Sequence, residues 1–253
     1  MRLTPELSAI EAYLRRAPYL HAYELGDLDP RELPHTTWLA NQPVDGVVLL
    51  YRGLTTPTVV ALAHDDPAAT HRLLENAELP ARFYAHLTTG LEAALTPRFH
   101  GELLGHHMKM GLTAKAAEIP ADPEVTRLGP ADGDEALAFY AVSYPTTVFE
   151  PVTLERGPYT AIRDARGIAA IAGVHVYSPT QRVASLGNIA TRPDARGVGH
   201  AQRVTAALCR LLAPEIDVIG LNVRGDNTAA IACYHAVGFA PRHFYEEWVF
   251  TAR

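Results

Sequence analysis

The sequence has little cysteine and no long apolar segment. Its 253 residues include two cysteines, Cys209 and Cys233, and both fall in apolar helical patterns. Two thiols are too few for a disulfide framework, so we expect core thiols in a reducing compartment. No apolar run approaches the roughly 18 residues that span a bilayer, and charge interrupts the first residues too often for a signal peptide. These absences predict a cytoplasmic protein with no membrane contact.

Positive charge is also scarce. The chain has 22 Lys and Arg residues against 28 Asp and Glu residues, a formal net charge of −6. Nonspecific nucleic-acid binding and attraction to anionic lipid both need a positive face, so we expect neither partner. A hydrophobic content of 48% describes a folded protein, and the length allows one large domain or two ordinary ones, of which we expect two. Chemistry on small molecules fits this composition best.

Apolar spacing and turn residues predict the elements of the first half. We expect helices over residues 5–16, 67–74 and 81–95, and strands over 21–25, 36–39, 47–51, 58–63 and 105–112. Thr4 is the candidate N-cap of the first helix. Strands this close together predict an antiparallel meander. Two prolines between residues 113 and 123 predict a linker, so we place domains at 1–115 and 124–253 with a linker at 116–123.

From residue 124 the pattern alternates between strand and helix. We expect strands over 125–128, 159–163, 168–177, 183–191, 217–223 and 242–250, and helices over 133–143, 198–212 and 228–237. This layout predicts an α/β fold with a mixed (α+β) sheet. Both halves follow a helix-then-strands plan, which leaves an internal duplication with one degenerate half open.

A glycine-rich turn follows the strand expected at 183–191. Gly197 and Gly199 stand on either side of Val198, directly before a helix. Glycines let the backbone approach an anion closely, and the first helical turn offers N–H groups that have no acceptor within the helix. Taken alone, the pattern fits a phosphate site and a plain tight turn equally well.

A second pattern lies 28 residues after Gly199. Asn227, Ala230 and Tyr234 stand at i, i+3 and i+7, so they share one helix face. A structural interpretation is also open: Asn227 as the N-cap, Tyr234 as a half-buried core aromatic and Gly238 as the residue that ends the helix.

Together the two segments resemble the GNAT N-acetyltransferase superfamily. The acyl-CoA motif R/Q-x-x-G-x-G/A of that superfamily is matched by Arg196, Gly199 and Ala201. A second signature, N-x-x-A-x-x-x-Y-x-x-x-G-F, is matched by Asn227, Ala230, Tyr234, Gly238 and Phe239. The resemblance covers about residues 124–253 and implies a GNAT fold there. The run GNIATRPDARGVG looks closest to the glycine N-acyltransferase-like branch, in which a smaller, degenerate GNAT-like α/β half precedes the catalytic domain.

The resemblance also implies the roles of single residues. Backbone amides from Gly197 through Ala201 would hold the pyrophosphate of acetyl-CoA, and the amide of Ile189 would polarise the thioester carbonyl. Asn227 would bind the CoA arm, and Tyr234 would protonate the departing thiolate. The implied acyl-CoA contacts are Ile189, Ala190, Thr191, Arg196, Gly197, Val198, Gly199, His200, Ala201, Asn227, Ala230 and Tyr234.

The general base is the point at which the sequence departs from the family. Many GNAT enzymes place a glutamate eleven residues before the R/Q of the loop, and Ser185 occupies that position here. A hydroxyl is no base near neutral pH, so His175 and Glu150 become the candidates, with Asn188 able to position a water. The alternatives are a solvent-facing strand histidine and an ordinary loop carboxylate.

These patterns predict an acyl-CoA-dependent N-acyltransferase that moves an acetyl or short acyl group to a primary amine of a small molecule or amino acid, by direct attack in a ternary complex. A protein N-acetyltransferase and a non-catalytic acyl-CoA-binding regulatory protein remain alternatives. We expect a monomer or homodimer that uses acetyl-CoA as co-substrate. No metal is expected, because His100, His106 and His107 lack paired ligand spacing. Met108 and Met110 are expected in the core.

Overall fold

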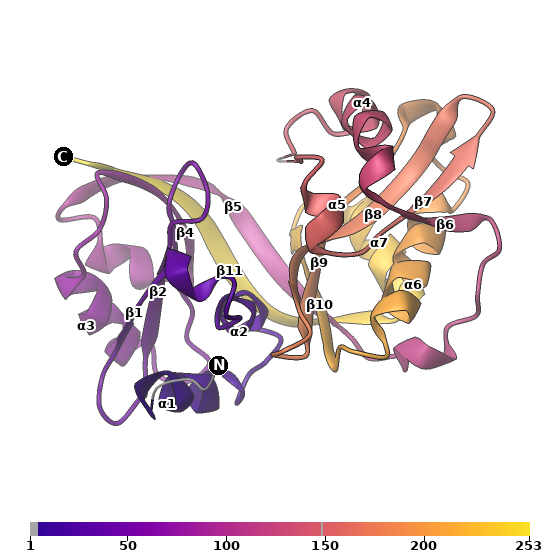
Figure 1. Cartoon of the computed structure of the whole chain (residues 1–253). Coiled ribbons are helices and arrows are strands. Elements are labelled where there is room, and N and C mark those ends of the chain that lie inside the picture. The colour runs from indigo at the N-terminus through magenta and orange to yellow at the C-terminus, as the bar shows by residue number, and fades with distance from the viewer. Residues whose placement is uncertain (1–4, 148) are drawn as a thin grey trace. The chain divides into compact units, whose positions relative to one another are not determined.

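The computed structural model describes residues 5–147 and 149–253, so the predicted cap at Thr4 lies outside the described residues. The chain forms two compact units (Figure 1). The first comprises Met1–Lys109, Val223–Asp226 and Arg242–Arg253, and the second comprises Met110–Asn222 and Asn227–Pro241. The units therefore do not follow a single cut in the sequence, and the domain boundaries expected at 115 and 124 stay a prediction.

The first unit is built on the first five strands of the chain together with most of the last one. Its elements are α1 (Pro5–Leu14), α2 (Ala22–Asp27), η1 (Leu33–His35), β1 (Thr36–Ala40), β2 (Val47–Tyr51), β3 (Thr58–Ala61), α3 (Ala68–Asn76), β4 (Arg82–Leu87), η2 (Leu91–Ala94), most of β5 (Phe99–Leu112) and most of β11 (Phe239–Ala252). The strand order is β1-β2-β3-β4-β11-β5. Strands β1, β2 and β3 are antiparallel, which confirms the meander, whereas β3 and β4 are parallel.

Two predictions for this unit are wrong. Residues 21–25 are not a strand: α2 starts at Ala22, and the buried side chains of His21 and Glu24 bond to each other at i, i+3, which is helical spacing. Residues 81–95 are not one helix either. The side chains of β4 alternate in burial, and Gly90 has a left-handed φ of 95° that separates β4 from η2.

The sheet of the first unit is covered on both faces, which explains its continuous apolar strands. In β2, Val48 and Leu50 belong to one core cluster with Phe83, while Leu49 belongs to another with Tyr245. Because neighbouring strand residues point to opposite faces, an uninterrupted apolar run is what a doubly covered strand needs.

A buried polar cluster lies inside this unit. Met108 is in the core, as expected, but its neighbour Lys109 is buried as well, with 1% of its surface exposed. The Lys109 Nζ atom lies 4.9 Å from the ring centre of Tyr23 and 5.1 Å from that of Tyr245. Burial lowers the pKa of Lys109. It also lowers the pKa of His86 to about 4, so this unit holds titratable groups that resist protonation.

The second unit carries the sequence patterns described above. Its elements are η3 (Ala116–Glu118), β6 (Val125–Leu128), η4 (Pro130–Asp132), α4 (Gly133–Ser143), α5 (Thr153–Arg156), β7 (Tyr159–Asp164), β8 (Gly167–Ser178), β9 (Val183–Thr191), η5 (Pro193–Ala195), α6 (His200–Leu212), β10 (Val218–Arg224) and α7 (Thr228–Val237). In the order β10-β9-β8-β7-β6, the pairs are antiparallel except β9 with β10. The predicted mixed sheet is therefore confirmed.

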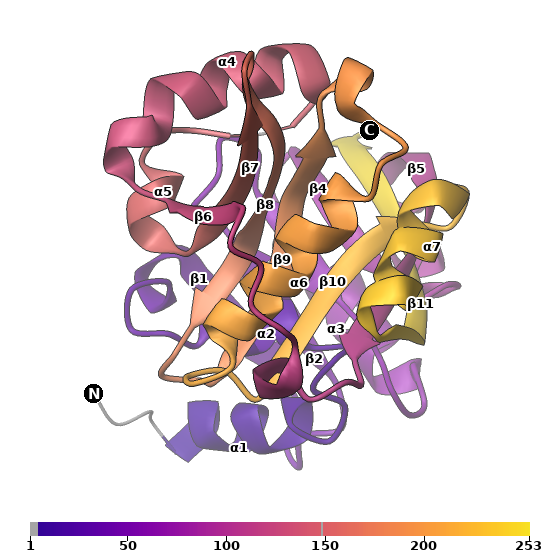
Figure 2. The ribbon, with the colours of Figure 1, turned by 90° about the vertical axis from the view of Figure 1, so that its right-hand side faces the viewer.

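The helices of this unit follow their patterns closely. Helix α6 packs against β7, β8 and β9 with Val204, Leu208 and Leu212 buried, and Figure 2 shows it lying across these strands. Residues at i, i+4 and i+8 share one helix face, so the apolar stripe dictates this packing. No helix in residues 5–147 and 149–253 is long and apolar enough to cross a membrane.

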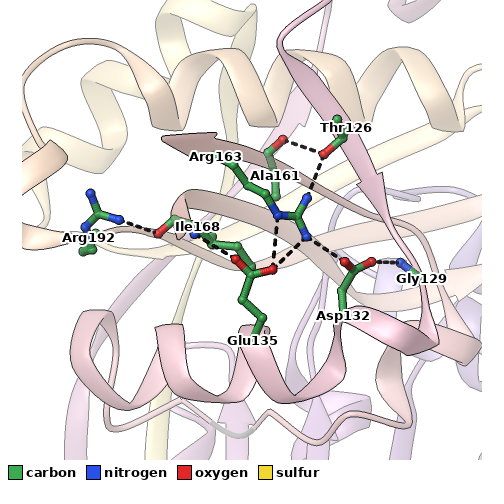
Figure 3. A network of polar contacts seen from close by, with 8 residues as sticks. All are labelled: Thr126, Gly129, Asp132, Glu135, Ala161, Arg163, Ile168 and Arg192. Carbon is green, nitrogen blue, oxygen red and sulfur yellow. Dashed lines mark hydrogen bonds and ion pairs between the residues drawn. The ribbon is translucent and has the colours of Figure 1, made fainter. Parts of the chain in front are cut away.

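A polar network fastens α4 to the start of β8 (Figure 3). Glu135 accepts two hydrogen bonds from Arg163 and one from the main-chain N–H of Ile168, while Arg163 also bonds to Asp132. Arg192, the first residue after β9, donates to the Ile168 carbonyl at 3.0 Å. The chain that enters the glycine-rich turn is therefore anchored to the end of the sheet.

Candidate active site

Strands β9 and β10 separate part of the way along their length. Their parallel register runs from Val183↔Val218 to Leu186↔Leu221. Beyond these pairs β9 continues to Thr191, where it is again paired with β8, and β10 continues to Arg224. Strands that diverge leave main-chain N–H and C=O groups able to pair with a third extended chain.

A bulge in β9 lies at the point of separation. Asn188 has a left-handed φ of 53°, and between the pairs Gly187↔Gly173 and Ala190↔Ile171 strand β9 holds one residue more than β8. An extra residue in one strand bends that strand and changes the direction of the main-chain groups that follow it. Ile189, whose amide is the predicted thioester contact, is the next residue.

The glycine-rich turn lies directly before a helix, as its sequence predicts. Gly197 has φ 82° and Gly199 has φ 87°, and α6 begins directly after Gly199. A Cβ atom at either glycine would meet nothing within 4 Å, so it is the left-handed backbone, and not space, that requires glycine. Arg196 donates from Nε to the carbonyl of Thr191 at 3.2 Å and closes the turn. The turn ends at the first N–H groups of α6, which have no acceptor within the helix.

Helix α7 begins and ends as its pattern indicates. The Oδ1 atom of Asn227 accepts from the N–H of Ala230 at 3.1 Å, so the N-cap interpretation is confirmed. Gly238 ends the helix with φ 107°. With Oδ1 used by the cap, the amide nitrogen is the part of Asn227 that can contact a ligand.

Tyr234 is placed on α7 as a buried phenol. Its ring packs edge-on against Phe239, and its hydroxyl makes no hydrogen bond to any residue within 5–147 or 149–253. Burial raises the pKa of Tyr234 well above its usual value, so the phenol remains protonated at neutral pH. It can therefore donate a proton or a hydrogen bond, but it cannot serve as a base.

Asn188 is the centre of a polar network that the sequence did not reveal. Its side chain is buried, its Oδ1 atom accepts from the Thr147 hydroxyl at 2.7 Å, and it lies 3.0 Å from Nε2 of His175. Its Nδ2 atom donates to the Tyr159 hydroxyl at 2.9 Å, and its carbonyl accepts from the Tyr140 hydroxyl at 2.6 Å. Asn188 thus joins β9 to α4, β7, β8 and the loop that follows α4.

The two candidate bases are placed differently. His175 is exposed and lies against β9, where it contacts Asn188 and Gly187. Glu150 is an exposed loop residue whose carbonyl accepts from the Thr153 hydroxyl, and its carboxylate pairs with no described residue. Ser185, where many GNAT enzymes have glutamate, is 1% exposed. The structure thus brings His175, and not Glu150, to the diverging strand.

Sequence reasoning missed Thr147, Tyr140 and Tyr159 as parts of this site. Tyr140 on α4 and Tyr159 on β7 are both buried. A buried tyrosine usually has a hydrogen-bond partner for its hydroxyl, so the two tyrosines themselves were the only indication of this network in the sequence. The partner itself lies 48 residues from Tyr140 along the chain, beyond any local pattern.

Comparisons with known proteins bear on the fold. Residues 168–249 match the family model of FR47-like proteins. A GNAT-family protein from Novosphingobium aromaticivorans is 19% identical, with a TM-score of 0.63 over 91% of this chain and 96% of that chain. The chain has the GNAT fold. A GCN5-related N-acetyltransferase from Kribbella flavida, which shares this fold, is 17% identical, with a TM-score of 0.60 over 93% of this chain and 95% of that one.

A tandem GNAT protein from the clavulanic acid biosynthesis pathway is 18% identical, with a TM-score of 0.55 over 96% of this chain and 93% of that chain. These GNAT structures extend over both halves of the sequence, in agreement with a GNAT fold preceded by a smaller GNAT-like half. No curated protein matches the chain. The glycine N-acyltransferase-like branch stays a prediction.

Proposed function

We propose that this protein is an acyl-CoA-dependent N-acyltransferase that moves an acetyl group from acetyl-CoA to a primary amine of a small molecule or amino acid. The separation of β9 from β10, next to a turn with left-handed Gly197 and Gly199, carries the proposal. The strand edge would pair with the amides of the pantetheine arm, and the turn would face the pyrophosphate. Most of the donor site is main chain, which suits a net charge of −6 without a lysine cluster.

The proposed reaction is a direct attack in a ternary complex. The amine nitrogen forms a bond to the acyl carbon, the carbonyl oxygen gains negative charge, and the Ile189 amide donates to that oxygen. One donor of this kind contributes about 3 kcal/mol to lowering the barrier. The carbon–sulfur bond then breaks, and Tyr234 donates to the departing thiolate. The products are the N-acyl amine and the free thiol of CoA.

The amine must be unprotonated when it attacks. An ammonium with a pKa near that of lysine needs a base, and His175 is the residue we propose, because its ring contacts the strand that holds Ile189. Histidine has an ordinary pKa close to neutral, which suits proton transfer in either direction. Glu150 remains the second candidate for the base.

Release of CoA thiol from acetyl-CoA tests the proposal. The purified chain is incubated with acetyl-CoA and a panel of primary amines and amino acids, and acetylated products are identified by mass spectrometry. We expect thiol release that depends on at least one amine. Binding of acetyl-CoA without turnover on any member of the panel would instead support the non-catalytic acyl-CoA-binding alternative. Turnover on peptides alone would support a protein N-acetyltransferase.

A further inference from the structure

The hydrogen bonds around Asn188 fix the orientation of its side-chain amide. The Tyr159 hydroxyl donates to the carbonyl of Val174 at 3.3 Å, so its oxygen is free to accept from Nδ2 of Asn188 at 2.9 Å. That fixes the amide with Oδ1 towards Thr147 and His175. Every polar atom of the Asn188 side chain is then used, as burial requires.

The direction of the amide determines the protonation of His175. Amide oxygen only accepts hydrogen bonds, so Nε2 of His175, 3.0 Å from Oδ1, must carry a hydrogen. A neutral imidazole with a hydrogen on Nε2 has its lone pair on Nδ1. Asn188 therefore selects one of the two tautomers of His175 without adding charge.

The main chain of Asn188 has a second effect. The carbonyl of Asn188 and the N–H of Ile189 belong to the same planar peptide group. The Tyr140 hydroxyl, which is buried and whose pKa is raised by that burial, donates to this carbonyl at 2.6 Å. A hydrogen bond to the carbonyl holds the plane in one orientation and strengthens its N–H as a donor.

The left-handed backbone joins the two effects. At φ 53°, Asn188 adopts a conformation that asparagine tolerates better than most residues. In this conformation its side chain meets Thr147 and His175 while its carbonyl meets Tyr140. One residue thus organises both the candidate base and the peptide group that precedes Ile189.

We propose that Asn188 is a positioning residue that fixes the Nε2–H tautomer of His175 through its side chain and, together with Tyr140, orients the N–H of Ile189 through its own peptide group. The catalytic meaning of this arrangement rests on the proposed acyltransferase function. The tautomer of His175 and the environment of the Ile189 amide do not depend on turnover. Both can therefore be tested without a substrate.

Nitrogen NMR of the whole 253-residue chain tests the side-chain part. Long-range proton–nitrogen spectra distinguish protonated from unprotonated ring nitrogens, and His175→Gln identifies the signal of His175. We expect an Nε2–H tautomer in the wild-type chain. Asn188→Gly keeps the left-handed backbone but removes the side chain, so the Nε2–H population of His175 should fall. Asn188→Asp, whose carboxylate still accepts from Nε2–H, should keep Nε2 protonated.

Arg182→Gly is the matched control, because Arg182 is also left-handed at φ 55° and bonds to Asp217, away from the network. It should leave the His175 signal unchanged. An Nδ1–H tautomer in the wild-type chain, which an amide turned the other way would give, would overturn the proposal. So would an Asn188→Gly spectrum identical to that of the wild type.

Tyr140→Phe tests the main-chain part. It removes one hydroxyl and keeps the ring contact with Phe149. We expect the amide signal of Ile189 to shift, whereas Tyr84→Phe, at an exposed tyrosine of the first unit, should not move it. On an accepted amine, we expect kcat to fall about tenfold while KM for acetyl-CoA stays within about twofold. An unmoved Ile189 signal would contradict the proposal.

The outcomes separate this inference from the proposed function. If the His175 and Ile189 signals respond as expected but no amine is acetylated, the positioning role of Asn188 stands and the acyltransferase proposal fails. If amines are acetylated but the signals do not respond, the acyltransferase proposal stands and the positioning role fails.

Discussion

The imidazole of His175 lies directly against the backbone of Gly187, where a Cβ atom would stand 2.3 Å from Cδ2 of the ring. No side chain fits between them, so Gly187 is what allows the ring to reach Asn188. We expect Gly187→Ala to push the imidazole away from Asn188 and lower kcat by about tenfold, because a base out of position transfers protons poorly.

The ring can rotate, so the free energy of unfolding of Gly187→Ala should fall by no more than about 2 kcal/mol. Gly129→Ala is the control, since a Cβ at Gly129 would meet nothing within 4 Å and its φ of −127° suits any residue. Steady-state kinetics and urea unfolding measure the two effects. Wild-type kcat in Gly187→Ala would show that His175 is not the base.

The glycine-rich turn gives a prediction about donor binding. Alanine at Gly197 or Gly199 would force a side chain into a left-handed backbone, at a cost of about 1–2 kcal/mol, or make the turn rearrange. We expect either substitution to weaken acetyl-CoA binding about tenfold, as measured by calorimetry. Gly90→Ala introduces the same kind of strain at φ 95° in the first unit, and it should leave the affinity unchanged.

Tyr234→Phe separates chemistry from stability. The Tyr234 hydroxyl bonds to no residue that the structure describes, so its removal should change the free energy of unfolding by less than about 1 kcal/mol. CoA thiolate is already a tolerable leaving group. We therefore expect kcat to fall about 10- to 100-fold, with KM for acetyl-CoA nearly unchanged. If the chemical step limits the rate and Tyr234→Phe leaves kcat unchanged, the proposed acid role of Tyr234 is ruled out.

The buried histidine of the first unit predicts how stability depends on pH. Burial lowers the pKa of His86 to about 4, against 6.5 for an ordinary histidine. Between these values the unfolded chain binds a proton that the native chain does not, so the free energy of unfolding falls as the pH falls. From pH 7 to pH 5 this group should remove about 2 kcal/mol.

His86→Gln, which cannot take up the proton, should lose correspondingly less stability over the same range, while Lys109 and Glu247 beside it remain. Urea unfolding of both proteins at pH 7 and pH 5 measures the difference. Equal losses in the two proteins would show that His86 does not resist protonation in the native state.

The sequence predicted best where local rules decide the structure. The bounds of α4, β9 and α7 match the expected ranges, because each begins or ends at a glycine, a cap or a clear change of period. The glycine-rich turn before α6 was also found from the sequence, whereas its left-handed glycines come from the structure. The prediction for residues 21–25 failed because a short apolar run fits helix and strand alike, and tertiary burial chose between them. The prediction for residues 81–95 failed because it joined β4 and η2, which Gly90 separates.

The candidate site divides in the same way. The turn and the face of α7 are sequential motifs and could be found from the sequence. The Asn188 network could not, since Thr147 lies 41 residues and Tyr159 29 residues from Asn188 along the chain. Buried Lys109 was missed for a similar reason: its aromatic neighbours Tyr23 and Tyr245 come from the two ends of the sequence.

Amide NMR of the chain with and without acetyl-CoA tests the central claim most directly, because the proposed donor site is made of backbone N–H groups. The account predicts that acetyl-CoA shifts the amide signals of Gly197 through Ala201 and those of Ile189 through Thr191, with the largest changes in these two segments. Shifts confined to other regions, or no saturable change at all, would contradict it.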